Sequence, residues 1–138
     1  MAHAKFPVEI LSPEGQVFEG EVEMLSTRTT TGSIGILANH TPLLAMLDPT
    51  ELRLYESEND YIKFAQAEGY LQVGGNRALI LVEQAHPPEE LDAGDLREKL
   101  QRAESEVESA GEDSEQGRVA ARDKDRWETF LRIAEGGG

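Results

Sequence analysis

Residues 71–82 read Leu-Gln-Val-Gly-Gly-Asn-Arg-Ala-Leu-Ile-Leu-Val, which carries the clearest secondary-structure pattern in the chain. Leu71 and Val73 flank a polar residue, as expected of a strand with one buried face. Gly74-Gly75-Asn76 is typical of a tight hairpin turn, because glycine and asparagine readily adopt the positive φ angles that such turns need. The run from Ala78 to Val82 then indicates a buried strand. The stretch therefore predicts a β-hairpin.

The same pattern of short strands and turns continues outward to residues 6 and 86. Apolar residues alternate with other residues at Phe6, Val8 and Ile10, at Val22 and Met24, and at Leu52 and Leu54. Glu21 and Glu23 predict a strand with one face in water around Val22. Turn chemistry occurs at residues 13–15 and 57–60. About eight to ten strands at this spacing predict an antiparallel β-sandwich over residues 1–86.

A second domain, residues 87–138, is predicted to begin at Pro87-Pro88, because two prolines interrupt both strands and helices. Asp92 is a good N-cap for a first helix, and Gly111 is a natural stop. After a polar loop over residues 112–117, a second helix is predicted from about Arg118 to Ala134. The apolar positions are Leu96, Leu100, Ala103, Val107 and Ala110, then Ala120, Trp127, Phe130, Leu131 and Ala134. The predicted fold is mainly β with α, an N-terminal antiparallel β-sandwich followed by a C-terminal two-helix hairpin.

The predicted hairpin has narrow apolar stripes that are rich in alanine. Burying these side chains against each other gives several kcal/mol at about 25 cal/mol per Å². Ordering the backbone of some forty residues costs at least as much, at roughly 1 kcal/mol per residue. We therefore expect the hairpin to depend on docking elsewhere and to change conformation readily.

Charge and composition exclude several classes of function. The formal net charge is −14, and residues 1–86 carry 5 basic and 12 acidic side chains. This balance argues against nucleic acid and against anionic membrane surfaces as partners. The chain has no cysteine, its three histidines show no metal-ligand spacing, and its apolar runs are too short to cross a bilayer. We expect no metal, no cofactor and no membrane insertion.

Catalytic motifs are not evident. The sequence has no phosphate-binding loop, and Gly32 and Gly35 are better explained as turn glycines than as a dinucleotide fingerprint. His40 fits a buried or turn-capping histidine better than a catalytic one. Arg118, Arg122 and Arg126 recur every four residues and so share one helix face. This face is either a solvated surface paired with nearby acids or a docking surface for an acidic partner, with Trp127 as a core or docking anchor.

Residues 32–44, Gly-Ser-Ile-Gly-Ile-Leu-Ala-Asn-His-Thr-Pro-Leu-Leu, closely resemble a specific segment of the epsilon subunit of F-type ATP synthases. In that family the segment reads Gly-x-hydrophobic-Gly-Ile-x-x-x-His-x-Pro-Leu. Residues 6–20 resemble the family's first hairpin, and Leu131-Arg132-Ile133 resembles the close of its last helix. Residues 68–73 resemble its Gly-Gly-aromatic-Leu-x-Val strand, with Glu68 in place of the first glycine. The resemblance spans nearly the whole chain in order.

The resemblance implies a non-catalytic subunit of the central stalk, peripheral on the cytoplasmic face of the bacterial plasma membrane. Its implied partners are the gamma subunit, the c ring and the catalytic alpha/beta head. In the family, the sandwich contacts gamma and the c ring, and the hairpin folds on the sandwich or extends to inhibit ATP hydrolysis. The implied partner-binding residues are Ser33 and His40 in the sandwich and Arg118, Arg122, Arg126 and Trp127 in the hairpin.

Two further positions depart from the family pattern. The loop facing the c ring often carries an acid where this chain has Ser33. Members that bind ATP carry an Ile/Leu-Asp-x-x-Arg-Ala motif, whereas residues 91–96 read Leu-Asp-Ala-Gly-Asp-Leu, with Asp95 in place of the arginine. Because a carboxylate repels nucleotide phosphate, we expect no regulation by ATP.

Two alternatives from other classes remain open on the residues alone. One is a free-standing β-sandwich binding module whose helical tail recognises a different partner. The other is a small hydrolase that depends on His40.

Overall fold

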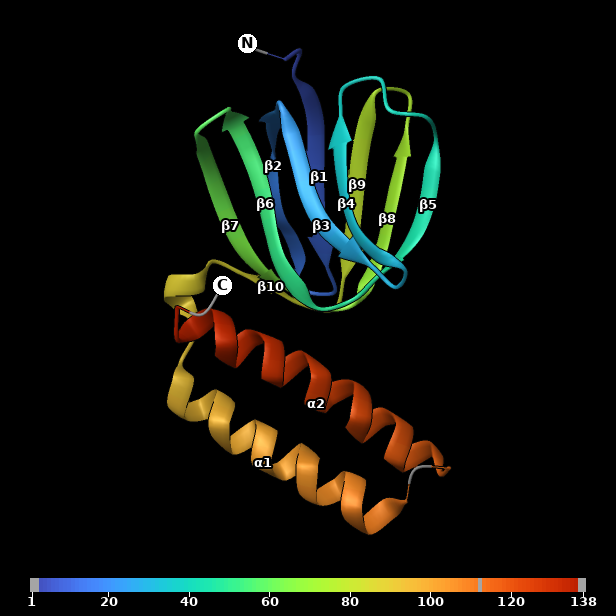
Figure 1. Ribbon diagram of the computed structural model, residues 1–138, viewed down its shortest axis with the longest axis vertical. Coiled ribbons are helices and arrows are strands. Elements are labelled where there is room, and N and C mark those ends of the chain that lie inside the picture. Colours follow the sequence, from blue (N-terminus) through green and yellow to red (C-terminus); the bar gives the residue numbers. More distant parts are fainter. Residues whose placement is uncertain (1–2, 112, 137–138) are drawn as a thin grey trace. The chain divides into compact units, whose positions relative to one another are not determined.

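The computed structural model describes residues 3–111 and 113–136. Their contacts divide the chain into two compact units, residues 1–87 and residues 88–138. Figure 1 shows the first unit as a β-structure and the second as a pair of helices. The predicted fold class, a β-sandwich followed by a two-helix hairpin, is confirmed.

Ten strands form the first unit within the described residues. They are β1 (Phe6–Ser12), β2 (Gly15–Val22), β3 (Met24–Thr29), β4 (Gly32–Leu37), β5 (Leu43–Leu47), β6 (Thr50–Ser57), β7 (Asp60–Gln66), β8 (Gly69–Gly74), β9 (Arg77–Val82) and β10 (Ala85–His86). Their order is β10-β7-β6-β3-β5-β8-β9-β1-β2, with β4 beside β3. Figure 1 shows β7, β6 and β3 in front of β2 and β1, so the sheet folds over into two layers. Thr29 of β3 pairs with Leu47 of β5, which joins the layers.

The core lies between the two layers and comes from alternate residues of the strands, as the period-two pattern predicts. Its buried members are Phe6, Val8, Ile10, Val22, Leu25, Ile36, Leu47, Leu52, Leu54, Phe64, Leu71, Val73, Ala78, Ile80, Val82 and Ala85. The prediction of a wholly buried run from Ala78 to Val82 is wrong in one respect. Leu79 and Leu81 lie on the other face of β9, and Leu81 is exposed.

The predicted hairpin at residues 71–82 is confirmed. Gly75 and Asn76 both have φ of 59°, which is the left-handed pair of a tight two-residue turn between β8 and β9. The strands are not all antiparallel, because β1 pairs with β9 in parallel. These two strands are far apart in the chain, and the intervening strands supply the crossover that a parallel pair requires.

The region around Glu23 differs from the prediction. Val22 ends β2 and Met24 begins β3, so the single strand predicted here is two strands separated at Glu23. Glu23 at the break is buried, and its backbone N–H donates to Tyr55 O at 2.7 Å. Periodicity alone cannot reveal such a break, because apolar and acidic residues alternate across it in the sequence, although Val22 faces the core and Met24 the opposite face.

A buried polar network ties three segments of the sandwich together. Gln66 in β7 is fully buried, and its Oε1 accepts a hydrogen bond from Thr27 Oγ1 at 2.6 Å. Its Nε2 donates to Asp48 O at 3.0 Å and to Ala67 O at 3.1 Å. Both the oxygen and the nitrogen of the buried Gln66 amide therefore have hydrogen-bond partners. The network links β3, β7 and the loop before β6.

Gly69 provides a test of how tightly β8 packs against β9. A Cβ atom added there would lie 2.7 Å from Val82 Cα and would also contact the Leu81 carbonyl. We expect Gly69→Ala to lower the free energy of unfolding by about 1–3 kcal/mol, because backbone cannot move aside cheaply. Gly74→Ala in the same strand is the matched control, since no atom lies within 4 Å of its added Cβ. Urea unfolding measures both, and equal stability of the two variants would contradict the packing argument.

The second unit consists of a short 3-10 helix (Pro88–Glu90), α1 (Ala93–Ala110) and α2 (Glu115–Ala134). Asp92 caps α1 as predicted, with Oδ1 accepting from Asp95 N at 3.1 Å. Gly111 ends α1 with a φ of 84°, also as predicted. The second helix begins at Glu115, before the predicted Arg118, because Ser114 Oγ accepts from Gly117 N at 2.9 Å and acts as an N-cap. Glu112, part of the predicted loop, lies outside the described residues.

The two helices contact each other along stripes that match the prediction only in part, because Ile133 is buried although the prediction omitted it, while Leu131 and Ala134 are half-buried. In α1 the buried side chains are Leu96 and Ala103, while Leu100 and Val107 are half-buried. In α2, Ala120, Phe130 and Ile133 are buried apolar residues. Neither of these described helices is both long and apolar enough to cross a membrane.

Candidate functional site

The outer face of one sandwich layer carries a row of apolar side chains. The register pairs Met46 with Tyr70 across β5 and β8, and Tyr70 with Leu81 across β8 and β9. The parallel pairing of β9 with β1 then places Leu11 beside Leu81. Directly paired residues lie on the same face of a sheet, so these four side chains form one row across four strands. Leu44, paired with Gln72, lies in the adjacent row of that face.

These side chains are unusually exposed for apolar residues. Leu44 is 72% exposed, Met46 56% and Tyr70 49%. Leu11, Tyr70 and Leu81 also line a shallow hollow of about 340 Å³, with Pro13, Glu68 and Glu83 at its margin. Single exposed apolar residues need no explanation, but a contiguous group rimmed by polar residues marks an interaction site. We call Leu11, Leu44, Met46, Tyr70 and Leu81 the apolar face.

Two apolar runs in the sequence point to the apolar face, but the strand pattern alone does not show which of their side chains would be exposed. Residues 43–47 and 78–82 are the two longest apolar runs, with apolar residues on both sides of each strand. Such a run fits a strand covered on both faces by its own chain. In this fold the sandwich core covers only one face of each strand, and on the other face Leu44, Met46 and Leu81 are exposed.

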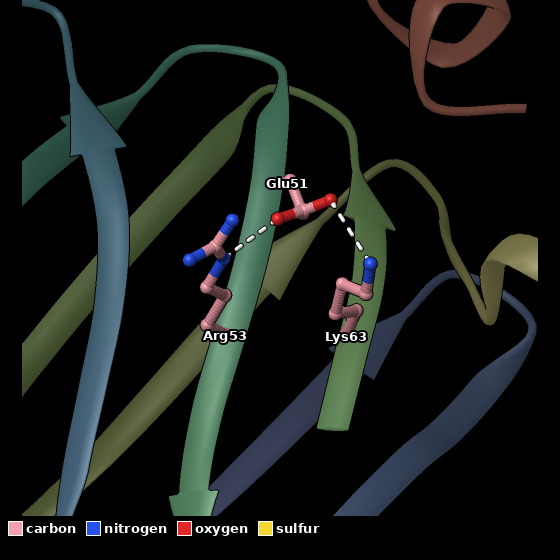
Figure 2. A network of polar contacts seen from close by, with 3 residues as sticks. All are labelled: Glu51, Arg53 and Lys63. Carbon is pink, nitrogen blue, oxygen red and sulfur yellow. Dashed lines mark hydrogen bonds and ion pairs between the residues drawn. The ribbon is translucent and has the colours of Figure 1, made fainter. Parts of the chain in front are cut away.

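Over β6 and β7, the outer face of the other layer carries charged side chains that pair with one another. Figure 2 shows Glu51 and Arg53 on β6 beside Lys63 on β7. Arg53 Nε donates to Glu51 Oε2 at 2.6 Å, and Lys63 Nζ lies 3.8 Å from Glu51 Oε1. The Arg53 guanidinium also lies 5.0 Å from the centroid of the Tyr61 ring. Hydrogen bonding to Tyr55 and to Glu51 raises the pKa of Arg53 above its already high ordinary value, so this side chain stays cationic.

Ser33 and His40 lie at opposite ends of β4. Ser33 is exposed near the start of the strand, next to the β3–β4 turn, and pairs with Arg28. His40 follows the end of the strand and is half-buried, with Nδ1 2.7 Å from Thr41 O. The neighbouring Asn39 N–H donates to Asn76 Oδ1 at 2.7 Å, which links the His40 loop to the β8–β9 turn. The structure therefore does not bring Ser33 and His40 together, and the His40 contact is that of a turn-capping residue.

The three predicted arginines share the helix α2 but differ in exposure. Arg118 and Arg122 are exposed, and Arg118 Nη1 donates to Asp113 O at 3.1 Å. Arg126 is only 7% exposed. Its Nη1 lies 4.0 Å from Asp123 Oδ1, and its guanidinium lies 5.2 Å from the centroid of the Trp127 ring. The basic face that the spacing predicts is thus split into an accessible part and a buried part.

Trp127 is half-buried and packs edge-on against Phe130, with ring centroids 6.0 Å apart. The Lys99 ammonium on α1 lies 4.8 Å from the centroid of its ring. The indole therefore belongs to the contact between the two helices. Among residues 3–111 and 113–136, no group of three or more acidic or histidine side chains could hold a metal ion.

Comparison with known proteins gives a consistent result. Residues 5–88 match the family described as ATP synthase, Delta/Epsilon chain, beta-sandwich domain. An ATP synthase epsilon chain from Persephonella marina is 35% identical over 130 residues, covering 94% of this chain and 96% of that relative. Another from Clostridium novyi is 38% identical over 102 residues, covering 74% of this chain and 78% of that relative.

Two solved structures share the fold. A chain in the OSCP/F1/c-ring structure of the Euglena gracilis mitochondrial ATP synthase matches with a TM-score of 0.74 at 20% identity, covering 98% of this chain and 82% of that chain. A chain in the central stalk and c-ring structure of the Tetrahymena thermophila mitochondrial ATP synthase matches with a TM-score of 0.63 at 18% identity, covering 97% of this chain and 99% of that chain. With a family match over most of the chain and relatives of similar length, this protein belongs to the ATP synthase epsilon chain family, whose members are accessory, non-catalytic subunits of the enzyme.

Proposed function

We propose that this chain is a central-stalk subunit that couples ion-driven rotation to ATP synthesis, and that its apolar face is the surface that binds gamma. The observation that carries the proposal is the exposure of Leu44, Met46 and Tyr70 on a chain of the epsilon family. A contiguous exposed apolar surface suits a chain that binds another protein, and the epsilon-chain relatives make the ATP synthase complex the expected partner rather than that of a free-standing module. Family membership also makes the His40 hydrolase untenable.

The dimensions of the apolar face fit a helical partner. Four neighbouring strands spaced about 4.8 Å apart extend the row over roughly 14 Å, and a helix with its side chains is about 10 Å across. The hollow beside Tyr70 and Leu81 offers a place for an anchoring side chain from that partner. A rigid stalk needs a contact of this kind, because torque is lost if the sandwich slips on its neighbour.

We further propose that the end of the sandwich with the β3–β4 turn and Ser33 faces the c ring. Ser33 is exposed there, and the opposite end is occupied by the linked loops of His40 and Asn76. The chain is then held at the membrane by partners, on the cytoplasmic face in bacteria, rather than by a span of its own. This arrangement makes the sandwich a link between gamma and the c ring.

The hairpin is proposed to inhibit ATP hydrolysis by docking on the alpha/beta head. Two features support this role. Its apolar seam is narrow, with Leu96 and Ala103 as the buried residues of α1, so the closed form is only marginally stable. Its second helix presents Arg118 and Arg122 to solvent, where an acidic surface of the head can bind them.

Purification of the native complex tests the proposed assembly. A tagged copy of the full chain, extracted from membranes in mild detergent, is expected to bring gamma, the catalytic head and the c ring with it. A free-standing binding module would be recovered with a different partner and without the catalytic subunits. Absence of gamma from an otherwise intact purification would overturn the proposal.

Regulation by ATP is not expected in this chain. Asp95 Oδ2 lies 3.1 Å from Lys99 Nζ, so the residue at the motif's arginine position is an anion already paired with a cation. A nucleotide phosphate would meet a negative charge there and would compete for Lys99. Titration calorimetry of the isolated chain with ATP and magnesium is expected to show no specific binding. A saturable signal at micromolar ATP would show that other residues of the hairpin form a site.

A further inference from the structure

Two cations lie against the single tryptophan of the chain, and a carboxylate on the same helix holds each of them. On α1, the Lys99 ammonium lies 3.1 Å from Asp95 Oδ2 and 4.8 Å from the centroid of the Trp127 ring. On α2, the Arg126 guanidinium lies 5.2 Å from the same centroid, and its Nη1 lies 4.0 Å from Asp123 Oδ1. We call these five residues the indole latch.

Within the indole latch, Lys99 on α1 contacts Trp127 on α2 and so joins the two helices. Tryptophan has the strongest cation-binding ring of the aromatic side chains. The carboxylate of Asp95 favours this arrangement, because it holds the ammonium near the ring at i,i+4 spacing. One cation–π contact is a sizeable part of the contact between the helices, because the buried apolar residues of α1 are one leucine and one alanine.

A second contact between the helices is weaker. Arg97 Nη2 lies 2.9 Å from Glu135 Oε2, but the two side chains are 58% and 47% exposed. Exposed ion pairs contribute little, because water and salt screen them and both side chains lose freedom. The Lys99 side chain is less exposed, at 40%, and its ring partner Trp127 is half-buried, so the Lys99–Trp127 contact is the better candidate for controlling whether the hairpin is closed.

The geometry points to an ordered docking of the second helix. We propose that the indole latch holds the hairpin closed, and that an acidic partner surface engages Arg118 and Arg122 first. It reaches Trp127 and Arg126 only after Lys99 leaves the ring, because the closed hairpin buries Arg126 and holds Lys99 against the half-buried indole. Closing the hairpin and full docking then exclude each other, so the strength of the latch sets the share of chains able to dock.

The identity of the partner rests on the proposed function, but the latch is a property of the chain alone. The full chain allows it to be measured directly, because Trp127 is its single tryptophan and it has no cysteine. Spin labels at Glu104→Cys and Ala121→Cys, two exposed helix positions, report the distance between α1 and α2. Quenching of Trp127 fluorescence by neutral acrylamide reports access to the indole.

Three variants separate the latch from general charge effects. Lys99→Met removes the cation and keeps much of the stem, and Lys99→Arg keeps the cation. Lys124→Met, on α2 and outside the indole latch, removes the same charge. Lys99→Met is expected to raise the ratio of open to closed hairpins about two- to fivefold and to increase quenching, as loss of one cation–π contact implies. Lys99→Arg and Lys124→Met are expected to behave like the unaltered chain.

An unchanged distance distribution and unchanged quenching in Lys99→Met would overturn the latch. The assembled enzyme then separates the latch from the proposed inhibition. If Lys99→Met opens the isolated hairpin and also lowers ATP hydrolysis by the complex, both hold. If it opens the hairpin without any effect on hydrolysis, the latch stands and the inhibitory role fails. If the hairpin stays closed while its deletion still raises hydrolysis, the latch fails and the inhibitory role stands.

Discussion

Leu44→Asp and Met46→Asp are each expected to weaken the binding of gamma by about a hundredfold, with little change in the stability of the free chain. Both side chains are more than half exposed, so an aspartate there meets water before assembly. In the complex the same carboxylate would be buried against apolar surface without a partner. Interface anchors cost about 2 kcal/mol or more when they are removed, and burying a charge adds to that cost. Titration of purified gamma with each variant measures the effect.

Leu37→Asp is the matched control for this experiment. Leu37 is 40% exposed and lies on β4, in the outer face of the other layer. The register places it beside Met24, which pairs in turn with Tyr55 on the same outer face. If gamma binds the apolar face, Leu37→Asp keeps its affinity. Equal losses from Leu37→Asp and Leu44→Asp would show that charge alone, rather than position, weakens binding.

Deleting residues 87–138 is expected to raise ATP hydrolysis by the assembled complex about fivefold or more, a typical size for regulatory coupling. The sandwich core is complete before Pro87, with β10 ending at His86, so the shortened chain should still bind gamma. A cooperative thermal transition of the chain ending at His86 is the folding control. Hydrolysis is then measured on complexes that contain equal amounts of gamma and of either chain. Equal rates would show that the hairpin is not an inhibitor.

Replacing Arg118 and Arg122 with alanine separates charge from the mere presence of the hairpin. Both are exposed, so this pair can change docking without disturbing the indole latch. Arg126 is left in place, because its burial against Trp127 would confuse the result. The double replacement is expected to raise ATP hydrolysis by part of the amount that the deletion does. High salt should weaken inhibition by the unaltered chain. Replacing Arg102, which is an exposed arginine on α1, should have no such effect.

Features set by neighbouring residues were predictable from the sequence. Gly74-Gly75-Asn76 forms the predicted turn, and Asp92 and Gly111 bound the first helix as predicted, because turns and caps depend on a few adjacent backbone groups. The predicted start of the second helix, at about Arg118, was three residues too late because Ser114 was not recognised as its N-cap. The parallel pairing of β1 with β9 was not predicted, since strand patterns carry no information about which distant strand lies alongside.

The candidate site was less predictable than the fold. Equal spacing places Arg118, Arg122 and Arg126 on one stripe but does not show that Arg126 would be buried beside Trp127. The alternation of residues likewise cannot show whether Leu81 is buried by its own chain or exposed on the outer face. Both distinctions depend on packing between segments that are separate in the sequence. The roles of the six predicted partner-binding residues stay predictions.

Site-directed photocrosslinking in the assembled complex tests directly whether the apolar face binds gamma. The chain has no cysteine, so a benzophenone maleimide can be placed at Met46→Cys or at Leu37→Cys without background labelling. The two positions lie on the outer faces of opposite layers of the sandwich. Irradiation is expected to join the chain to gamma from position 46 and not from position 37. A crosslink to gamma from position 37, with none from position 46, would show that gamma binds the opposite layer and not the apolar face.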